Sequence, residues 1–429
     1  MIRTGRHDLL TPVDAAWFRM DEAEDPADVA SVLFFDGPLD EARLRRTLED
    51  RLLEHRRFRR RVVDRGRLLP PEWKDDEQFR IDTHLRHLDL APDDDLADVL
   101  SELMSVPMSF AHSPWSWTIL HGLPEGDAAF VRIHHCLGDG FALLDVLMSL
   151  ADTDGAQADA RPPPPAVRDD GSTRGATRSL AHLLALRFDP ATFLRGPLSG
   201  RRRVAWTERF ALAQVKTIAH AHRATVNDFL LASLSAALRR YLVAREGTAS
   251  PIRAIVPVNL RPCDVPIDLE QGNWFGLVFL DLPVGEDSRE RRLTALRRSM
   301  DRLKRSKEAG VALWILGLMG RVPIAVDRMI EWLFAHKASV VVTNVPGPKS
   351  RLHLAGSPVR DMFFWVPHPC GLGLGVSIMS YAGHVRVGFR ADTAIVPDPG
   401  LLARFFTEEL TMELAPGARQ EGEHERHVT

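Results

Sequence analysis

The sequence has few cysteines and lacks any long hydrophobic run. Three cysteines occur among its 429 residues, Cys136, Cys263 and Cys370. Such a sparse and odd set is typical of reduced thiols in a cytosolic protein, and it excludes a disulfide framework. The longest apolar run, residues 310–320, is shorter than the roughly 20 residues that span a bilayer, and the polar residues 1–12 lack a signal-peptide core. We therefore expect a cytoplasmic protein.

The chain also lacks an excess of positive charge. It carries 55 basic and 58 acidic residues, which gives a net charge of −3. A dedicated nucleic-acid binder is usually basic overall, so we expect no nucleic-acid partner. Hydrophobic residues make up 45% of the chain, and this length is enough for two or three domain-sized cores.

Two adjacent histidines end a predicted buried strand. Residues 128–133 are mostly apolar, His134 and His135 follow, and Gly138 and Gly140 then allow a tight turn before a helix-like run. Successive side chains of a strand point to opposite faces, so the two imidazoles are expected to diverge. Only one of them can then easily face a given reaction centre.

Asp139 completes the pattern His-His-x-x-x-Asp-Gly. The pattern resembles the active-site motif of the CoA-dependent acyltransferase superfamily, in which the second histidine is the general base. By that resemblance His135 removes a proton from a hydroxyl or amine that attacks a thioester carbonyl. The alternatives are a metal-binding pair or two histidines satisfied at a strand end, and for Asp139 a helix N-cap. Diverging side chains disfavour the metal pair.

A proline-rich stretch divides the chain. Residues 162–165 are four prolines, and their surroundings are rich in Gly, Asp and Arg, which is typical of a linker. We predict an N-terminal half over residues 1–151, a linker over 152–195, a C-terminal half over 196–415 and a disordered tail over 416–429.

Hydrophobic periodicity predicts individual elements within these segments. The leucines between residues 44 and 52 repeat at helical spacing, and residues 79–85 are expected to form a strand. Residues 311–334 are predicted to be helical. Residues 376–381 and 385–389 are predicted to form a hairpin.

Some polar motifs have a good structural explanation. The run from Thr225 to Asp228 approximates a capping box, so we favour a structural role for Asn227 and Asp228 over a catalytic one. The arginine clusters at residues 56–61 and 201–203 are interpreted as solvated turns, with a phosphate or anionic-lipid contact or a basic rim as the alternative.

Over residues 12–401 the chain resembles the bacterial wax ester synthase/diacylglycerol acyltransferase family. The resemblance implies an α/β fold of two chloramphenicol-acetyltransferase-like halves, each a mixed sheet with flanking helices, and a channel between them that leads to the histidine. It also implies transfer of a fatty acyl group from acyl-CoA to a long-chain alcohol or to diacylglycerol, at a membrane or lipid-droplet surface. The motifs that carry it follow the family's order: Pro12-Val13-Asp14, His134-His135 through Gly140, Gly200-Arg201-Arg202, Asn227-Asp228, Pro257-Val258-Asn259-Leu260-Arg261, Gly272-Asn273 and Asn344-Val345-Pro346-Gly347-Pro348.

The resemblance also suggests roles for single residues. His135 would act by direct transfer, without a covalent enzyme intermediate. Asn273 is our candidate donor to the oxyanion, with a turn asparagine as the alternative. Arg261 is the candidate partner of Asp139, with a surface arginine as the alternative. No metal and no bound cofactor is implied, because acyl-CoA is a substrate.

The chain departs from the family's pattern in the turn Cys136-Leu137-Gly138, where a bulkier third residue is common, and in a motif before the predicted histidine strand. The family usually has Pro-Leu-Trp where this chain has Pro114-Trp115-Ser116, which bears on the shape of the acyl or alcohol pocket. Two rival functions remain. One is a related acyltransferase with a polyketide alcohol or an amine as acceptor, and the other is a catalytically silent lipid-binding protein. An intact His135 and Asp139 argue against the silent protein.

The apolar run near residue 315 has two interpretations. Residues 311–321 are apolar on all sides, which is typical of a buried core helix, and this interpretation is slightly favoured. Trp314 and the nearby Arg321 and Arg328 instead suit a helix that lies at a membrane surface.

Overall fold

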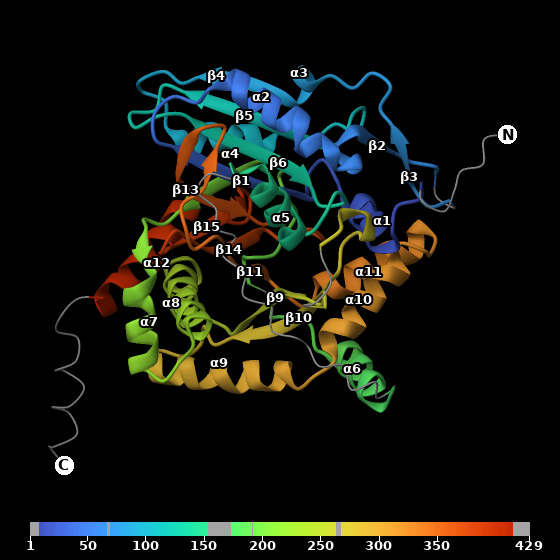
Figure 1. Ribbon diagram of the computed structural model, residues 1–429. Coiled ribbons are helices and arrows are strands. Elements are labelled where there is room, and N and C mark those ends of the chain that lie inside the picture. The colour runs from blue at the N-terminus through green and yellow to red at the C-terminus, as the bar shows by residue number, and fades with distance from the viewer. Residues whose placement is uncertain (1–7, 67–68, 153–172, 191, 263–266, 415–429) are drawn as a thin grey trace, which may run out of the picture.

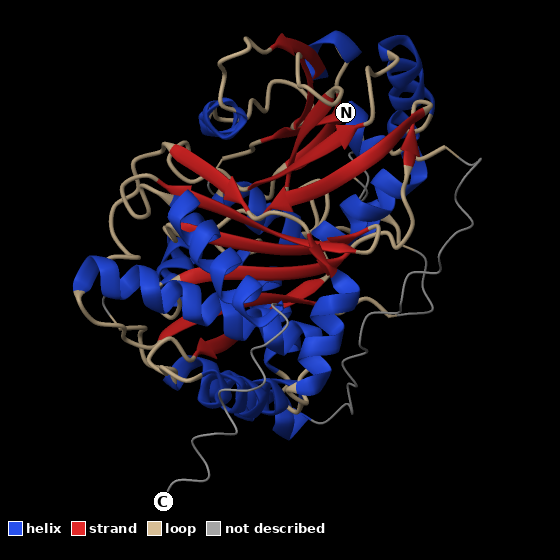
Figure 2. Cartoon of the chain, turned by 90° about the vertical axis from the view of Figure 1, so that its left-hand side faces the viewer, coloured by secondary structure: helices blue, strands red, loops and turns tan. Residues whose placement is uncertain are grey.

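The computed structural model describes residues 8–66, 69–152, 173–190, 192–262 and 267–414 (Figure 1). The predicted tail and the proline-rich part of the predicted linker lie outside these residues. Two mixed β-sheets run through the middle of the molecule, and helices surround them (Figure 2). This is the predicted α/β class.

The first sheet is built mainly by the N-terminal part of the chain. Its strand order is β12-β13-β1-β6-β5-β4, and all neighbours are antiparallel except β4 and β5. The predicted strand before the two histidines is confirmed as β6. The bounds are β1 (Asp28–Phe35), β4 (Leu85–Asp89), β5 (Trp115–His121), β6 (Ala128–His134), β12 (His353–Leu354) and β13 (Ser357–Trp365). The helices of this part are α1 (Pro12–Met20), α2 (Glu41–Asp50), α3 (Ile81–His84), α4 (Leu96–Ser105) and α5 (Gly140–Leu150).

The second sheet has the order β10-β9-β11-β14-β15-β7, with β8 paired to β15. The predicted hairpin is confirmed as β14 and β15. The strands are β7 (Arg202–Trp206), β8 (Phe210–Ala211), β9 (Ile252–Asn259), β10 (Phe275–Leu282), β11 (Val340–Pro346), β14 (Leu374–Tyr381) and β15 (His384–Asp392). The helices are α6 (Thr173–Ala185), α7 (Leu212–Ala221), α8 (Val226–Glu246), α9 (Arg289–Lys304), α10 (Glu308–Met319), α11 (Ile324–Ala335) and α12 (Pro399–Leu414).

Two hydrophobic clusters flank the second sheet. Helices α7, α8, α9 and α12 bury their apolar side chains in one cluster with its strands. In the other cluster, Ile315 and Met319 of α10 pack with Val13 and Trp17 of α1 and with Phe279 of β10. Helix α1 therefore belongs in space with the C-terminal helices, although it begins the chain.

The two sheets do not follow the predicted halves of the sequence. Strand β13 lies in the predicted C-terminal half, yet it pairs with β1 in the first sheet, where Ala30 opposes Trp365. The predicted boundaries at residues 151, 195 and 415 stay predictions. Helix α6 lies within the predicted linker and buries Leu183 in the cluster that contains α10.

Two predicted elements were wrong. Residues 79–85 are not one strand, because α3 begins at Ile81 and β4 begins only at Leu85. The polar residues Arg80, Asp82 and Thr83 interrupt the apolar run that suggested a strand. The predicted helical stretch 311–334 is divided between α10 and α11, because Pro323 caps the second helix and cannot continue the first.

The interpretation of the apolar run as a core helix is confirmed for most of α10. Leu316 and Met319 are buried, whereas Trp314 is 61% exposed. Within the described residues, no helix combines the length and the apolar character that crossing a membrane requires.

Candidate active site

His135 lies just beyond the end of β6. Its backbone amide donates a hydrogen bond to the carbonyl of Ala27, and its side chain is buried. The ring Nδ1 lies 3.0 Å from Oδ1 of Asn273, which comes from the loop before β10. The site is therefore assembled from both sheets.

The amide of Asn273 is held in one orientation. Its Nδ2 donates to Oδ1 of Asp14 at 2.7 Å and to the backbone carbonyl of His135 at 2.8 Å. Both acceptors lack a hydrogen, so Oδ1 of Asn273 must face the ring and accept from Nδ1–H. This contact fixes the tautomer of His135, whose Nε2 then carries the lone pair of a base.

This geometry differs from the role we expected for Asn273. A donor to an oxyanion needs a free N–H, but both amide hydrogens of Asn273 already have acceptors. Its backbone N–H also donates to Asp14, at 2.9 Å. The arrangement favours a side chain that positions His135 rather than one that binds the oxyanion.

Asp14 is anchored by an arginine from the predicted solvated cluster. Arg57 Nη1 lies 3.0 Å from Asp14 Oδ2, and both side chains are buried. The same guanidinium donates to the carbonyls of Cys136 and Leu137, in the turn that follows His135. The interpretation of residues 56–61 as a solvated turn was wrong for Arg57 and for Arg60, which is also buried.

An aromatic ring lies on the face of His135. The ring of Trp17 stacks on it with centroids 3.9 Å apart and planes 7° apart. Phe275 adds a tilted contact at 5.4 Å. Burial lowers the pKa of His135 to about 4, although the carboxylate of Asp139 opposes that shift. The imidazole is therefore neutral at pH 7, which is the state that a base requires.

Asp139 is both a helix cap and an ion-pair partner. Its carboxylate accepts from the backbone amides of Phe141 and Ala142 at the start of α5, as the N-cap alternative predicted. It also lies 2.6 Å from Nη1 of Arg261, so the predicted contact of these two residues is confirmed. Burial of Asp139 would raise the pKa of its carboxyl, but Arg261 outweighs this and holds the pKa below its ordinary value.

His134 faces different partners from those of His135, as the strand geometry predicted. Its Nδ1 accepts from the backbone amide of Cys136 at 3.1 Å, and its Nε2 lies 3.2 Å from Asp21. The ring is fully buried against the edge of Phe110. His134 therefore supports the turn, while His135 offers a nitrogen to a cavity.

The remaining predicted residues lie elsewhere or play local parts. Gly140 begins α5 and lines an apolar cavity. Thr225 and Asp228 form the predicted capping box of α8. Asn227 accepts a hydrogen bond from Asn344 of β11. Among the described residues, neither Asn227 nor Asp228 is found in contact with His135.

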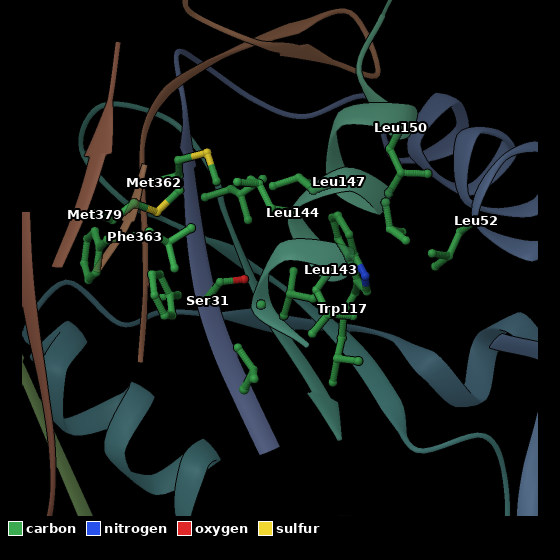
Figure 3. Close-up of a pocket in the computed structure, with 18 residues that line it drawn as sticks. Ser31, Leu52, Trp117, Leu143, Leu144, Leu147, Leu150, Met362, Phe363 and Met379 are labelled. Atoms are coloured by element: carbon green, nitrogen blue, oxygen red, sulfur yellow. The ribbon is translucent and has the colours of Figure 1, made fainter. Parts of the chain in front are cut away.

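Two apolar cavities border the site. The first, here called the α5 cavity, lies between α5 and the first sheet. Figure 3 shows its side chains, with Trp117 and the leucines of α5 on one side and Met362, Phe363 and Met379 on the other. Ser31 supplies a hydroxyl among these apolar groups. The displaced Trp115 does not line this cavity, because its indole N–H donates to the carbonyl of Phe58 in the core.

The second cavity, here called the α10 cavity, contains His135 in its wall. Trp17 and Phe275 line it beside the imidazole, and Leu316 of α10 and Phe334 of α11 line it farther away. Its lining is almost entirely apolar. An alkyl chain therefore suits this cavity better than a charged ligand does.

A cluster that could hold a metal lies away from this site. Glu41, His87 and His121 bring potential ligand atoms within 4.8 Å of one another. Because β5 and β6 are antiparallel, His121 at the end of β5 lies beside the start of β6, and His134 lies at the other end of these strands. Among the residues that the structure describes, no contact joins this cluster to His135.

Sequence reasoning missed three residues of the site, Trp17, Asp14 and Arg57. All three are far from His135 in the chain. Trp17 and Asp14 reach the site because α1 packs beside the second sheet, where Trp17 stacks on His135 and Asp14 holds Asn273. Arg57 comes from the segment before β2 (Arg60–Val63) and joins the site through Asp14. A signal existed for Asp14 alone, which belongs to one of the motifs shared with the family.

Comparisons with known proteins agree with this architecture. The family model of the wax ester synthase/diacylglycerol acyltransferase catalytic domain matches residues 10–187, and that of the WS/DGAT C-terminal domain matches residues 271–413. A Mycobacterium tuberculosis protein named as a diacylglycerol O-acyltransferase is 24% identical over 457 residues, which cover 96% of each chain. Another so named from that organism is 27% identical over 380 residues, covering 78% of this chain and 80% of the relative.

Solved structures share the fold. The wax ester synthase/diacylglycerol acyltransferase from Marinobacter aquaeolei superposes with a TM-score of 0.70 at 21% identity, over 95% of this chain and 98% of that one. The first condensation domain of the calcium-dependent antibiotic synthetase gives 0.62 at 19% identity, over 96% and 97%. Both domain models of the wax ester synthase/diacylglycerol acyltransferase family match this chain, the catalytic domain first and the C-terminal domain after it. The chain therefore belongs to that family.

Proposed function

We propose that this protein transfers a fatty acyl group from acyl-CoA to the hydroxyl of a long-chain alcohol or of diacylglycerol. The observation that carries the proposal is a neutral, buried His135 whose Nδ1–H is held by Asn273 and whose Nε2 is left for a proton. The apolar α10 cavity, which has this imidazole in its wall, suits an alkyl chain. The matched family models and the named relatives support the same reaction class.

The step needs only the two substrates and one base. Nε2 of His135 accepts the hydroxyl proton while the alcohol oxygen attacks the thioester carbon. The new C–O bond forms, the C–S bond breaks, and the imidazolium returns its proton to the CoA sulfur. The products are an ester and free CoA. Acyl-CoA acts as a substrate, and the step requires no further cofactor.

A product screen tests the proposal. Purified protein would be given palmitoyl-CoA with hexadecanol, diacylglycerol, a short alcohol or an amine, and free CoA release would be followed together with the lipid products. We expect ester formation with at least one long-chain alcohol or with diacylglycerol. Release of CoA only with the amine would instead support the rival acceptor class, and no release with any acceptor would contradict the proposal.

We further propose that α11 contacts a membrane or lipid-droplet surface. Unlike an ordinary surface helix, α11 buries acidic side chains and exposes apolar ones. Asp327 and Glu331 are buried, whereas Met329 is 63% and Trp332 is 54% exposed. On the buried side of α11, Arg19 of α1 lies 3.9 Å from the carboxylate of Asp327. On the exposed side, the apolar side chains can bind a lipid surface, which is where a protein with lipid-soluble substrates must collect them.

Neighbouring residues extend this apolar surface. Phe188 is half exposed and meets Trp332 edge to face at 5.7 Å, and Trp314 is exposed on the neighbouring α10. Aromatic rings of this kind favour the headgroup level of a bilayer. We define Phe188, Met329 and Trp332 as the α11 patch.

Flotation with vesicles tests the lipid contact. The double variant Met329→Ser/Trp332→Ser should stay folded, because both side chains are exposed, and it should lose binding to vesicles that contain phosphatidylglycerol. The matched control Val243→Ser/Met412→Ser changes exposed apolar residues of α8 and α12 and should float like the wild type. A wild-type protein that never floats would refute the contact.

A further inference from the structure

The α10 cavity extends from the imidazole toward the α11 patch. At its inner end the wall is formed by His135 and Trp17. At its outer end it reaches Glu331 and Ala335 of α11 and Cys370, which lies in the loop before β14. The cavity thus reaches from the candidate base to the helix that exposes its apolar side.

A surface depression meets the cavity at this outer end. The depression is bordered by exposed groups, among them Trp332 of the α11 patch. Four residues line both the depression and the cavity, and they therefore form the wall that separates them. We call these four residues the gate: Met20, Glu331, Ala335 and Cys370.

The gate is narrow and is built from side chains. The sulfur of Cys370 lies 3.7 Å from the sulfur of Met20 and 3.8 Å from Oε1 of Glu331. Methionine has three rotatable bonds and readily changes its packing. A shift of these side chains, without movement of a sheet, would join the depression to the cavity.

We propose that the gate admits the acceptor lipid from the membrane and that its alkyl chain then occupies the α10 cavity, with the hydroxyl toward His135. This proposal rests on the proposed function. The chemistry of the two substrates decides which one uses this route. Acyl-CoA carries a charged nucleotide that dissolves in water, and the almost entirely apolar α10 cavity excludes it. The acceptor is uncharged and dissolves in the bilayer beside the α11 patch.

Substitution of Ala335 tests the route. A bulky side chain in Ala335→Trp would fill the gate and shorten the space for an alkyl chain. Each excluded methylene costs about fourfold in binding, so turnover of hexadecanol should fall by about tenfold or more while turnover of butanol changes by less than about threefold. Dependence on the acyl length of the acyl-CoA, measured from octanoyl to palmitoyl, should not change. Ala244→Trp, at an exposed position of α8, is the matched control.

The outcomes separate this proposal from the proposed function. Equal loss with hexadecanol and butanol, unchanged turnover of both, or a loss that follows acyl length would overturn the route while acyl transfer itself remains observable. A wild-type protein that releases no CoA with any acceptor would remove the proposed function, and the route with it. Flotation of Ala335→Trp should equal that of the wild type, so that lost membrane binding is excluded as the cause.

A second variant keeps the test valid if Ala335→Trp fails to fold. Met20→Ala removes side-chain atoms from the gate and should widen it. Its turnover of diacylglycerol, the bulkier acceptor, should then rise relative to that of hexadecanol. An unchanged ratio in this variant would overturn the route.

Discussion

Nη1 of Arg261 lies 2.6 Å from the carboxylate of Asp139, although 122 residues separate the two in the chain. The second guanidinium nitrogen, Nη2, donates to the carbonyl of Gly272, the residue before Asn273. The carboxylate also accepts from the backbone amide of Trp274 at 3.1 Å. This pair therefore joins the turn after His135 to the loop that orients the imidazole.

Removal of one member of this pair should destabilise the protein strongly. Arg261→Ala leaves the buried carboxylate of Asp139 without its cation, and we expect the free energy of unfolding to fall by about 3–5 kcal/mol. A double-mutant cycle with Asp139→Ala, measured by urea denaturation, should show strong coupling. The exposed pair of Arg351 and Asp36 is the control, for which a coupling below about 1 kcal/mol is expected. Additive losses at Asp139 and Arg261 would rule out an energetic pair.

The two histidines should differ in their effect on turnover. His135→Ala removes the proposed base and should lower kcat by about a hundredfold to ten-thousandfold while the protein stays folded. His134→Ala should cost less activity, because its ring contacts Asp21 and a backbone amide rather than the cavity. Circular dichroism would confirm the fold of each variant. If His134→Ala were folded and the less active of the two, the assigned roles would be reversed.

The pH profile of kcat/KM for the wild type should lack the loss of activity near pH 6.5 that protonation of an ordinary histidine base causes. An ordinary histidine gains its proton near pH 6.5, but the pKa of His135 is lowered to about 4, so the base stays neutral down to that pH. We expect kcat/KM to be flat from pH 8 to about pH 5 and to fall only as the pH approaches 4. Initial rates of CoA release, with the fold checked at each pH, measure this. A midpoint at about 6.5 would contradict the buried, uncharged ring.

Asn273→Asp should move the acid limb of the kcat/KM profile to higher pH. A carboxylate at 3.0 Å from Nδ1 would stabilise the imidazolium, so the pKa of His135 should rise and the acid limb should move toward neutral pH. Asn273→Ala should lower kcat without such a shift toward neutral pH, because it removes the acceptor that fixes the tautomer but adds no charge. Loss of activity without any difference between the two pH profiles would show that Asn273 serves the fold alone.

Local signals in the sequence predicted the centre of the site. The apolar run before His134, the glycines after it and the apolar run beyond them predicted β6, the turn and α5, because each depends on neighbours in the chain. The capping box of α8 was accessible for the same reason. The contact of Arg261 with Asp139 was predicted from the family resemblance and not from the residues.

Long-range burial could not be predicted in this way. Arg57 lies in a cluster of arginines that composition assigns to solvent. Its buried position is explained by partners that are distant in the chain, namely the carboxylate of Asp14 and the carbonyls of Cys136, Leu137 and Glu270. Strand β13 has no regular alternation, because Arg360 and Asp361 interrupt it, and Asp361 is satisfied by Arg386 of β15. Its identity as a strand depends on β1, more than 300 residues earlier.

The place of β13 has a consequence for biosynthesis. A growing chain produces β1 long before β13, so the edge of β1 that β13 later covers presents unpaired backbone groups during translation. Contacts of such large sequence separation form slowly, and an open sheet edge favours aggregation. A fragment that ends before residue 353 should therefore be insoluble or chaperone-bound, and the N-terminal acyltransferase motif should not function as a separately expressed domain.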